Sequence, residues 1–200
     1  IWEIRFNMPG EQSDGYIDIE SDSVELSTWQ SIIDSLVSPT PDLAWISQQL
    51  DAFNYEFVHN SSDYPAGYYI LYENFPIEKG WGTFVYNSNS DTNLQIHVNH
   101  PVHDYNTHII GAKAFQELNA QWFLMAGTHR YANCATNNPN GNGCTPYDDC
   151  VSDMARNPHS VFQQVFETAF DGCDYTISFH SFSDADDYHD GASSINLSHG

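Results

Sequence analysis

The chain has 200 residues, with 5 Lys or Arg against 27 Asp or Glu, so its formal net charge is −22. A surface this acidic repels nucleic acid and anionic membrane surfaces, and we exclude both as expected partners. The 40% hydrophobic content, with 5 Trp, 12 Tyr and 12 Phe, is enough to build a core, which excludes a disordered acidic tail. No stretch approaches the roughly 20 apolar residues that a membrane-inserted helix needs.

The cysteines favour an oxidising compartment. Three of the four lie in a Gly-, Asn- and Pro-rich stretch, CATNNPNGNGCTPYDDC, which cannot build a core of its own. Such a loop gains most from covalent closure, so we expect disulfides and a secreted or extracytoplasmic protein. Four cysteines allow three pairings, and the sequence does not choose among them. Two Asn-X-Ser motifs, at Asn60 and Asn196, are potential glycosylation sites.

The first half of the chain is expected to hold strands and two amphipathic helices. Apolar residues at helical spacing define the helices, and Pro41 is expected to open the second of them. In chain order we predict a strand at 2–6, a helix that buries Trp29, Ile32, Ile33 and Leu36, a helix that buries Leu43, Ile46 and Leu50, and strands at 55–58, 68–72 and 82–86.

The second half is more regular. Leu94, Ile96 and Val98 alternate with polar residues, as in a half-buried strand. We then predict a helix at 105–118 whose apolar face holds Ile110, Ala114 and Leu118, flanked by Gly111 and Phe115. A strand at 122–126, a helix with Asn157 as N-cap and Pro158 as first residue, and a buried strand at 175–179 follow. Strand–helix–strand–loop–helix–strand order predicts a single α/β domain over residues 1–200, with a mixed, mostly parallel central sheet flanked by helices. The chain begins at Ile1, and we expect a processed product or a fragment of a longer protein.

Histidines gather where predicted strands end. Five of the ten lie between residues 97 and 129, and the densest piece, with His97, His100 and His103, sits where one predicted strand ends and the next helix begins. His129 follows the strand at 122–126, and His180 closes the strand at 175–179. Because the carboxyl ends of parallel strands meet at one edge of a sheet, we expect these histidines to converge there.

Imidazoles with a carboxylate are a donor set that suits Zn²⁺, which in catalytic sites has three protein ligands and an open position. His100 can share an ion with Asp104 or with His103 from a single turn, and His180 can supply the distant third ligand. The sequence therefore predicts a zinc site built from His100, His180 and either His103 or Asp104. The alternative is that these histidines are polar loop residues.

Arg130 is informative because basic residues are so scarce. Placed beside His129 after a strand, it could grip a substrate carboxylate bidentately, or it could pair with one of the many Asp residues. Arg156 has the same two interpretations. Asp153 could orient a ligand histidine, act as a base, or cap a turn.

Two segments resemble the zinc-dependent carboxypeptidase-like hydrolases, which comprise the metallocarboxypeptidases and their amidohydrolase relatives. The segment Thr176-Ile-Ser-Phe-His180-Ser181-Phe182 is similar to the strand that ends in the late histidine ligand of that family. The helix containing Gly111-Ala-Lys-Ala-Phe-Gln-Glu-Leu118 is similar to the helix that follows the first metal-binding pair. Arg130 lies roughly where the family places arginines that bind the substrate carboxylate. The resemblance covers about residues 94–183 and implies metal binding by His100 and His180.

The chain departs from the family pattern at two places. The position of the expected glutamate, three residues after His100, holds His103, with Asp104 one further on. The glutamate that acts as general base in the family lies well downstream of the late histidine, and the residues after His180 contain no glutamate. Aspartates at 184, 186 and 187 follow His180 closely, as a candidate base or as a solvated acidic loop.

The leading functional hypothesis is an extracytoplasmic zinc-dependent hydrolase of an amide or peptide bond in a small acidic or peptide-like substrate. A metal-activated water would attack the carbonyl, and His129 and Arg130 would position the substrate or stabilise the oxyanion. A second hypothesis is a non-catalytic secreted surface, filament or binding module with a vestigial or structural metal site. A metal-dependent phosphoesterase is disfavoured, because phosphate substrates usually need more cationic help.

Overall fold

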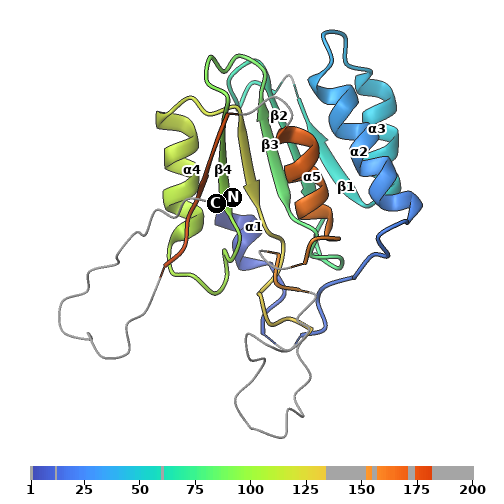
Figure 1. Ribbon diagram of the computed structural model, residues 1–200, viewed down its shortest axis with the longest axis vertical. Helices are drawn as coiled ribbons and strands as arrows, with labels where there is room; N and C mark the ends of the chain where they lie inside the picture. The colour runs from blue at the N-terminus through green and yellow to red at the C-terminus, as the bar shows by residue number, and fades with distance from the viewer. Residues whose placement is uncertain are drawn as a thin grey trace, which may run out of the picture.

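The computed structural model describes residues 2–11, 13–59, 61–133, 152–154, 157–170 and 174–181. These residues form a single α/β domain, in which a six-stranded mixed sheet lies between two layers of helices (Figure 1). The predicted fold class is therefore confirmed. The cysteines, the two Asn-X-Ser asparagines, Arg156 and the aspartates after His180 lie outside the described residues.

Most predicted elements are present within a few residues of their expected bounds. The helices are α1 (Trp2–Phe6), α2 (Val24–Val37), α3 (Leu43–Ala52), α4 (Thr107–Glu117) and α5 (Val161–Phe170). The strands are β1 (Tyr55–Val58), β2 (Tyr68–Glu73), β3 (Thr83–Asn87), β4 (Leu94–Val98), β5 (Trp122–Met125) and β6 (Tyr175–Ser178). Across the part of the chain that the structure describes, no helix has the length and apolar character needed to cross a membrane.

The strand order across the sheet is β1-β2-β3-β5-β4-β6. The pairs β1–β2, β2–β3 and β3–β5 are antiparallel, whereas β4 pairs in parallel with both β5 and β6. Four strands, β2, β4, β5 and β6, therefore run in the same direction. Parallel pairing itself is confined to the second half of the chain, where the histidines lie.

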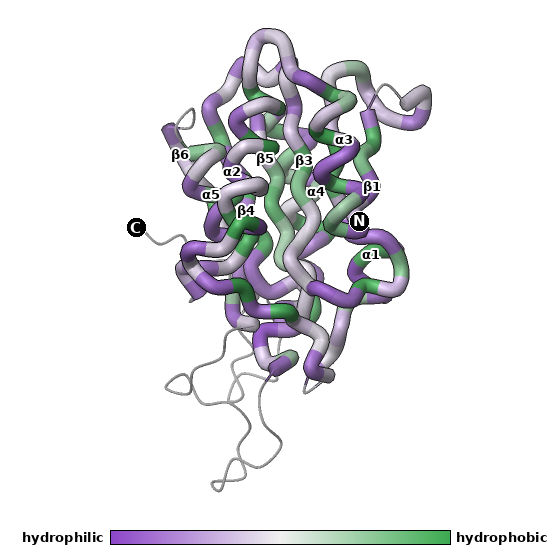
Figure 2. Tube along the Cα trace, turned by 90° about the vertical axis from the view of Figure 1, so that its right-hand side faces the viewer, coloured by the Kyte–Doolittle hydropathy of each residue, from purple (hydrophilic) through white to green (hydrophobic). Residues whose placement is uncertain are grey.

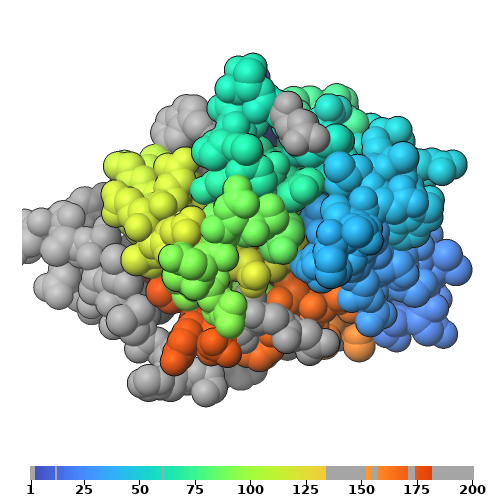
Figure 3. Space-filling model, turned by 90° about the horizontal axis from the view of Figure 1, so that it is seen from above, coloured from blue at the N-terminus to red at the C-terminus, as the bar shows by residue number. Residues whose placement is uncertain are grey.

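The two crossover connections place helices on opposite faces of the sheet. The chain passes from β4 through α4 to β5, and then from β5 through α5 back across β4 to β6. These two crossovers run in opposite directions along the sheet, and parallel crossovers are almost always right-handed, so α4 and α5 must cover different faces. Figure 1 shows α4 on one side and α5, with α2 and α3, on the other. The view from above in Figure 3 shows the same separation of α4 from α2 and α3.

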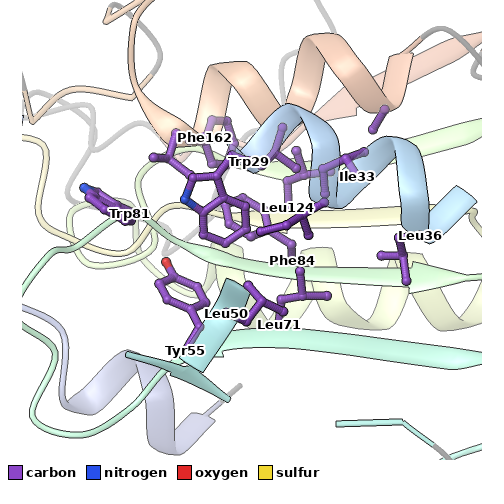
Figure 4. Packing of buried hydrophobic residues seen from close by; sticks show 14 of the residues in the cluster. Trp29, Ile33, Leu36, Leu50, Tyr55, Leu71, Trp81, Phe84, Leu124 and Phe162 are labelled. Atoms are coloured by element: carbon purple, nitrogen blue, oxygen red, sulfur yellow. The ribbon is translucent and has the colours of Figure 1, made fainter. Parts of the chain in front are cut away.

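Each face of the sheet carries its own apolar cluster, and the hydropathy colouring of Figure 2 shows apolar residues along the central strands. Beneath α2, α3 and α5, Trp29 is fully buried, and its ring contacts those of Phe53, Tyr55, Trp81 and Phe84 at centroid distances of 5.0 to 6.5 Å (Figure 4). Such edge and stacked contacts add to the gain from burying the rings themselves.

The other cluster lies beneath α4, which packs closely on the sheet because of a glycine. A Cβ atom at Gly111 would lie 2.5 Å from Cγ2 of Val98 in β4 and 3.3 Å from the ring of Phe123 in β5. This close approach fixes the helix over the strand whose end carries the histidines.

The prediction of a strand at 2–6 was wrong, because these residues form α1. Alternation over five residues does not distinguish the two structures, and the burial of Ile4 and Met8, four residues apart, follows a helical period. The Arg5 guanidinium donates to the carbonyls of Pro101 and Val102 at 3.4 Å, which ties α1 to the loop after β4.

Local details of four other elements also differ from expectation. Ser160, not Asn157, caps α5, because its hydroxyl accepts from the amide of Gln163 at 3.1 Å. Strand β4 is buried on both faces rather than one, since helices cover both. Strand β6 is the outer strand and is exposed at its start, where 72% of Tyr175 is accessible. On the predicted face of α4, Gly111 and Phe115 are buried as expected, whereas Leu118 is 46% exposed.

Candidate metal centre

Three of the predicted site residues meet at the carboxyl ends of β4 and β6. His100, Asp104 and His180 each offer a ligand atom, all within 4.8 Å of one another, and the group could hold a metal ion. The Oδ2 atom of Asp104 lies 3.4 Å from Nδ1 of His100 and 3.3 Å from Nδ1 of His180. This location adjoins the switch point of the sheet between β4 and β5, where the chain leaves the two strands toward opposite faces.

Asp104, rather than His103, faces the other two ligands. The amide of Asp104 donates to the carbonyl of His100 at 2.8 Å, which closes one helical turn. Residues three and four apart on such a turn both lie on the side of His100; in the structure the Asp104 carboxylate lies against His100, whereas the His103 ring contacts His129. Of the two alternatives, it is Asp104 that belongs to the group of side chains that could hold an ion.

The third ligand is placed by strand register. In the parallel pair β4–β6, His97 lies opposite Ser178, so the residues that follow these two strands leave the sheet side by side. The Nε2 atom of His180 lies 3.3 Å from the hydroxyl of Ser178 and 3.4 Å from the Asn99 amide nitrogen. These neighbours orient the ring with Nδ1 toward Asp104. Their role in orienting His180 was not predicted, although both side chains lie within the histidine-containing segments.

Asp153 forms a hydrogen bond with His100, the other histidine of the candidate metal group. Its Oδ1 accepts from Nε2 of His100 at 2.8 Å, and its Oδ2 accepts from the Arg130 guanidinium at 2.7 Å. This contact is the one that the interpretation of Asp153 as a residue orienting a ligand histidine requires. Of the two roles open to Arg130, the structure has the ion pair. A metal-binding histidine commonly donates the N–H of its other ring nitrogen to a carboxylate. Here that arrangement would keep the proton on Nε2 and leave the lone pair of Nδ1 free to bind a metal.

Electrostatics favour a cation at the centre. Burial acts to raise the pKa of Asp104, but the close ion pairs with the imidazoles of His100 and His180 outweigh it and hold the pKa of that carboxyl well below its usual range. Burial acts to lower the pKa of His100, but the carboxylates of Asp104 and Asp153 outweigh it, so the pKa is raised. Both Asp104 and Asp153 are thus ionised near neutral pH. Among the described side chains at the centre, positive charge to balance them comes only from the two histidines, and Arg130 pairs with Asp153 on its outer side.

Two buried atoms test whether a metal fits. Nδ1 of His100 and Oδ2 of Asp104 are inaccessible to solvent and make no hydrogen bond of good geometry. Buried polar atoms are normally satisfied, so two that face each other without one are what a missing cation would leave. A tetrahedral ion with bonds of about 2.1 Å holds its donors about 3.4 Å apart, which matches the two measured separations.

His103 and His129 form a separate pair beside the metal group. Nδ1 of His103 lies 3.3 Å from Nε2 of His129, and Nδ1 of His129 accepts from the amide of Tyr131 at 3.1 Å. Burial, reinforced by His103, lowers the pKa of His129 to about 4, so this ring is neutral at physiological pH. The structure therefore places His103 with His129 and outside the metal group.

His97 lies in the core and not at the site. Its ring contacts Phe162 and Phe166 edge-on, and its Nε2 is 2.9 Å from Oε1 of Gln95. Burial lowers its pKa to about 3. Its proximity to His100 in sequence is thus misleading, because the strand directs it to the α5 face.

We expect the stability of the protein to fall in acid because of His97. A base whose pKa is lowered by folding stabilises the native state above the unfolded value of about 6.5, and this contribution is lost as the pH falls toward 3. At pH 5 the loss is about 2 kcal/mol. A His97→Gln variant keeps a donor to Gln95, and its unfolding free energy in urea should fall less between pH 7 and pH 5 by that amount. Equal losses in the two proteins would contradict the assignment.

Comparison of the chain with family models, with curated proteins and with solved structures gives no match. The resemblance to carboxypeptidase-like hydrolases therefore stays an interpretation of short sequence motifs. Fold and site together define a single-domain α/β protein with a candidate metal centre beside the switch point of its sheet.

Proposed function

We propose that the protein is a zinc-dependent hydrolase of an amide or peptide bond in a small substrate that carries a carboxylate, and that it works outside the cytoplasm. The observation that supports this proposal most is the convergence of His100, Asp104 and His180 through two imidazole nitrogens and one carboxylate oxygen. Two nitrogens and an oxygen form a three-ligand set of the kind found at catalytic zinc sites.

The chain's own residues would divide the work as follows. His100, Asp104 and His180 hold the ion, which when bound supplies an activated water and a Lewis acid. Asp153 is a positioning residue, because it keeps the proton of His100 on Nε2. His129 and Arg130 follow β5 at the same edge of the sheet, and we assign to them the positioning of the substrate or of its developing oxyanion.

Because basic residues are scarce in this chain, Arg130 is a strong candidate for binding the substrate carboxylate. With 27 acidic against 5 basic residues, a substrate carboxylate meets repulsion over most of the protein. One edge of the Arg130 guanidinium holds Asp153, while its Nε is buried without a hydrogen-bond partner and its side chain is 21% accessible. A guanidinium with remaining donors can bind an anion in addition to Asp153.

The test begins with metal analysis of the purified protein, followed by hydrolysis assays on a panel of N-acyl amino acids and short peptides with and without added Zn²⁺. We expect one transition-metal ion per chain and activity that a chelator removes. A His100→Ala/His180→Ala double variant should lose both, while His159→Ala, which removes an exposed histidine before α5, should lose neither.

The possible results separate the proposal from its alternative. Stoichiometric metal without cleavage of any panel substrate would favour a non-catalytic binding module with a structural metal site. The absence of stoichiometric metal, or full activity in the double variant, would overturn the metal-dependent mechanism.

A further inference from the structure

A second site is indicated on the face of the sheet that α4 covers only in part. A cavity of about 670 Å³ has its floor on β2 and β3, away from the metal centre. Side chains two apart on a strand share a face, and the floor consists of Tyr68, Ile70 and Tyr72 from β2 with Thr83 and Val85 from β3. The volume lies within the range of small-molecule sites.

The walls of this cavity are aromatic. Tyr64 and Phe75 come from the loops on either side of β2, and Phe115 comes from α4. The side chains of Tyr64 and Phe75 are 49% and 44% accessible, although both flank an apolar cavity. Together with Tyr68 and Tyr72, five aromatic rings line the space, and large exposed rings around a cavity are typical of a surface that a ligand covers.

The charge at the cavity is negative. Glu3 of α1 lines it, and Glu56 of β1 lies opposite Tyr72 in the strand register, so its side chain is on the same face of the sheet. Burial raises the pKa of the Tyr72 phenol, and the carboxylates of Glu56 and Glu3 raise it further. Among the described residues that line the cavity there is no Lys, Arg or His.

We propose that this cavity binds a small organic cation, namely a substituted ammonium group that carries an apolar portion. Aromatic faces attract such cations through their quadrupoles, and the attraction grows when the site is partly desolvated. The carboxylates of Glu3 and Glu56 add a direct charge interaction. A neutral apolar ligand would use the rings but not the charge, and an anion would be repelled. This site is independent of the proposed hydrolase activity.

The experiment is calorimetric titration of the full chain, in the presence of EDTA, with choline and with its neutral carbon isostere 3,3-dimethylbutan-1-ol. We expect choline to bind at least about fivefold more tightly than the alcohol, and less tightly as KCl is raised. Glu3→Gln should weaken choline binding by about threefold to tenfold, as should Tyr72→Leu, whereas Tyr72→Phe keeps the ring and should retain affinity.

Two controls keep the result specific to the cavity. Glu167→Gln removes an exposed carboxylate from α5, on the opposite face, and should leave choline affinity unchanged. The His100→Ala/His180→Ala variant should also bind choline normally, whatever happens to metal binding. Equal affinity for choline and the alcohol, no detectable binding of choline, unchanged affinity in Glu3→Gln, or loss of binding in the double histidine variant would overturn the proposal.

Discussion

An Asp104→Asn variant should bind Zn²⁺ more than about 100-fold less tightly than the native protein, because it loses the only carboxylate among the three candidate ligands. Asparagine has nearly the same shape, so the turn that brings residue 104 over His100 should persist. The measurement is competition with a chromophoric chelator at constant pH.

The matched control for this variant is Asp51→Asn, which neutralises an exposed carboxylate in α3. It should leave zinc affinity unchanged. Native affinity in Asp104→Asn would mean that the ion is held elsewhere, with His103 the first alternative to examine.

Replacing Asp153 by Ala should lower the unfolding free energy of the metal-free protein by about 2–4 kcal/mol. The residue is 1% exposed and accepts hydrogen bonds from both His100 and Arg130, so its removal leaves two donors at a buried position. The expected loss is somewhat below the 3–5 kcal/mol of a fully buried pair, since about a fifth of the Arg130 side chain is accessible and screening weakens the interaction.

Urea unfolding with EDTA present measures this loss, and Asp34→Ala on the exposed face of α2 is the control, with an expected change within about 0.5 kcal/mol. The Asp153→Ala variant should also bind zinc about 10- to 100-fold less tightly than the native protein, because the orientation of His100 is lost. Native stability in Asp153→Ala would show that the two hydrogen bonds contribute no net free energy.

The helices and strands with strong periodicity could be predicted from the sequence, and the structure confirms them. The stripe of Trp29, Ile32, Ile33 and Leu36 is long enough to define a face, and the apolar strands around Ile96 and Phe123 are bounded by turns. Short elements were less predictable. Five residues at 2–6 fit either period, and their structure depends on packing against α4 and on the carbonyls that Arg5 reaches.

The candidate site was predictable in outline but not in its choice of side chains. Strand ends indicated where histidines would meet, because that follows from parallel topology. Positions 103 and 104 both lie on the side of His100 in this turn, and which of them contacts His100 depends on tertiary neighbours such as His129, which residue types do not reveal. Likewise, Asp153, the partner of Arg130, lies 23 positions away in sequence. The Gly-, Asn- and Pro-rich stretch between them has no periodic pattern from which their proximity could be predicted.

The register between β4 and β6 has a consequence for how firmly the edge of the sheet is held. Asp104 and His180 are 76 positions apart in the chain (180 − 104), and they become neighbours only when the outermost strand docks beside β4. An ion held by both would bind the docked arrangement and not the open one, so its binding free energy would oppose local detachment of that strand. The metal would thus stabilise the β6 edge of the sheet against local opening.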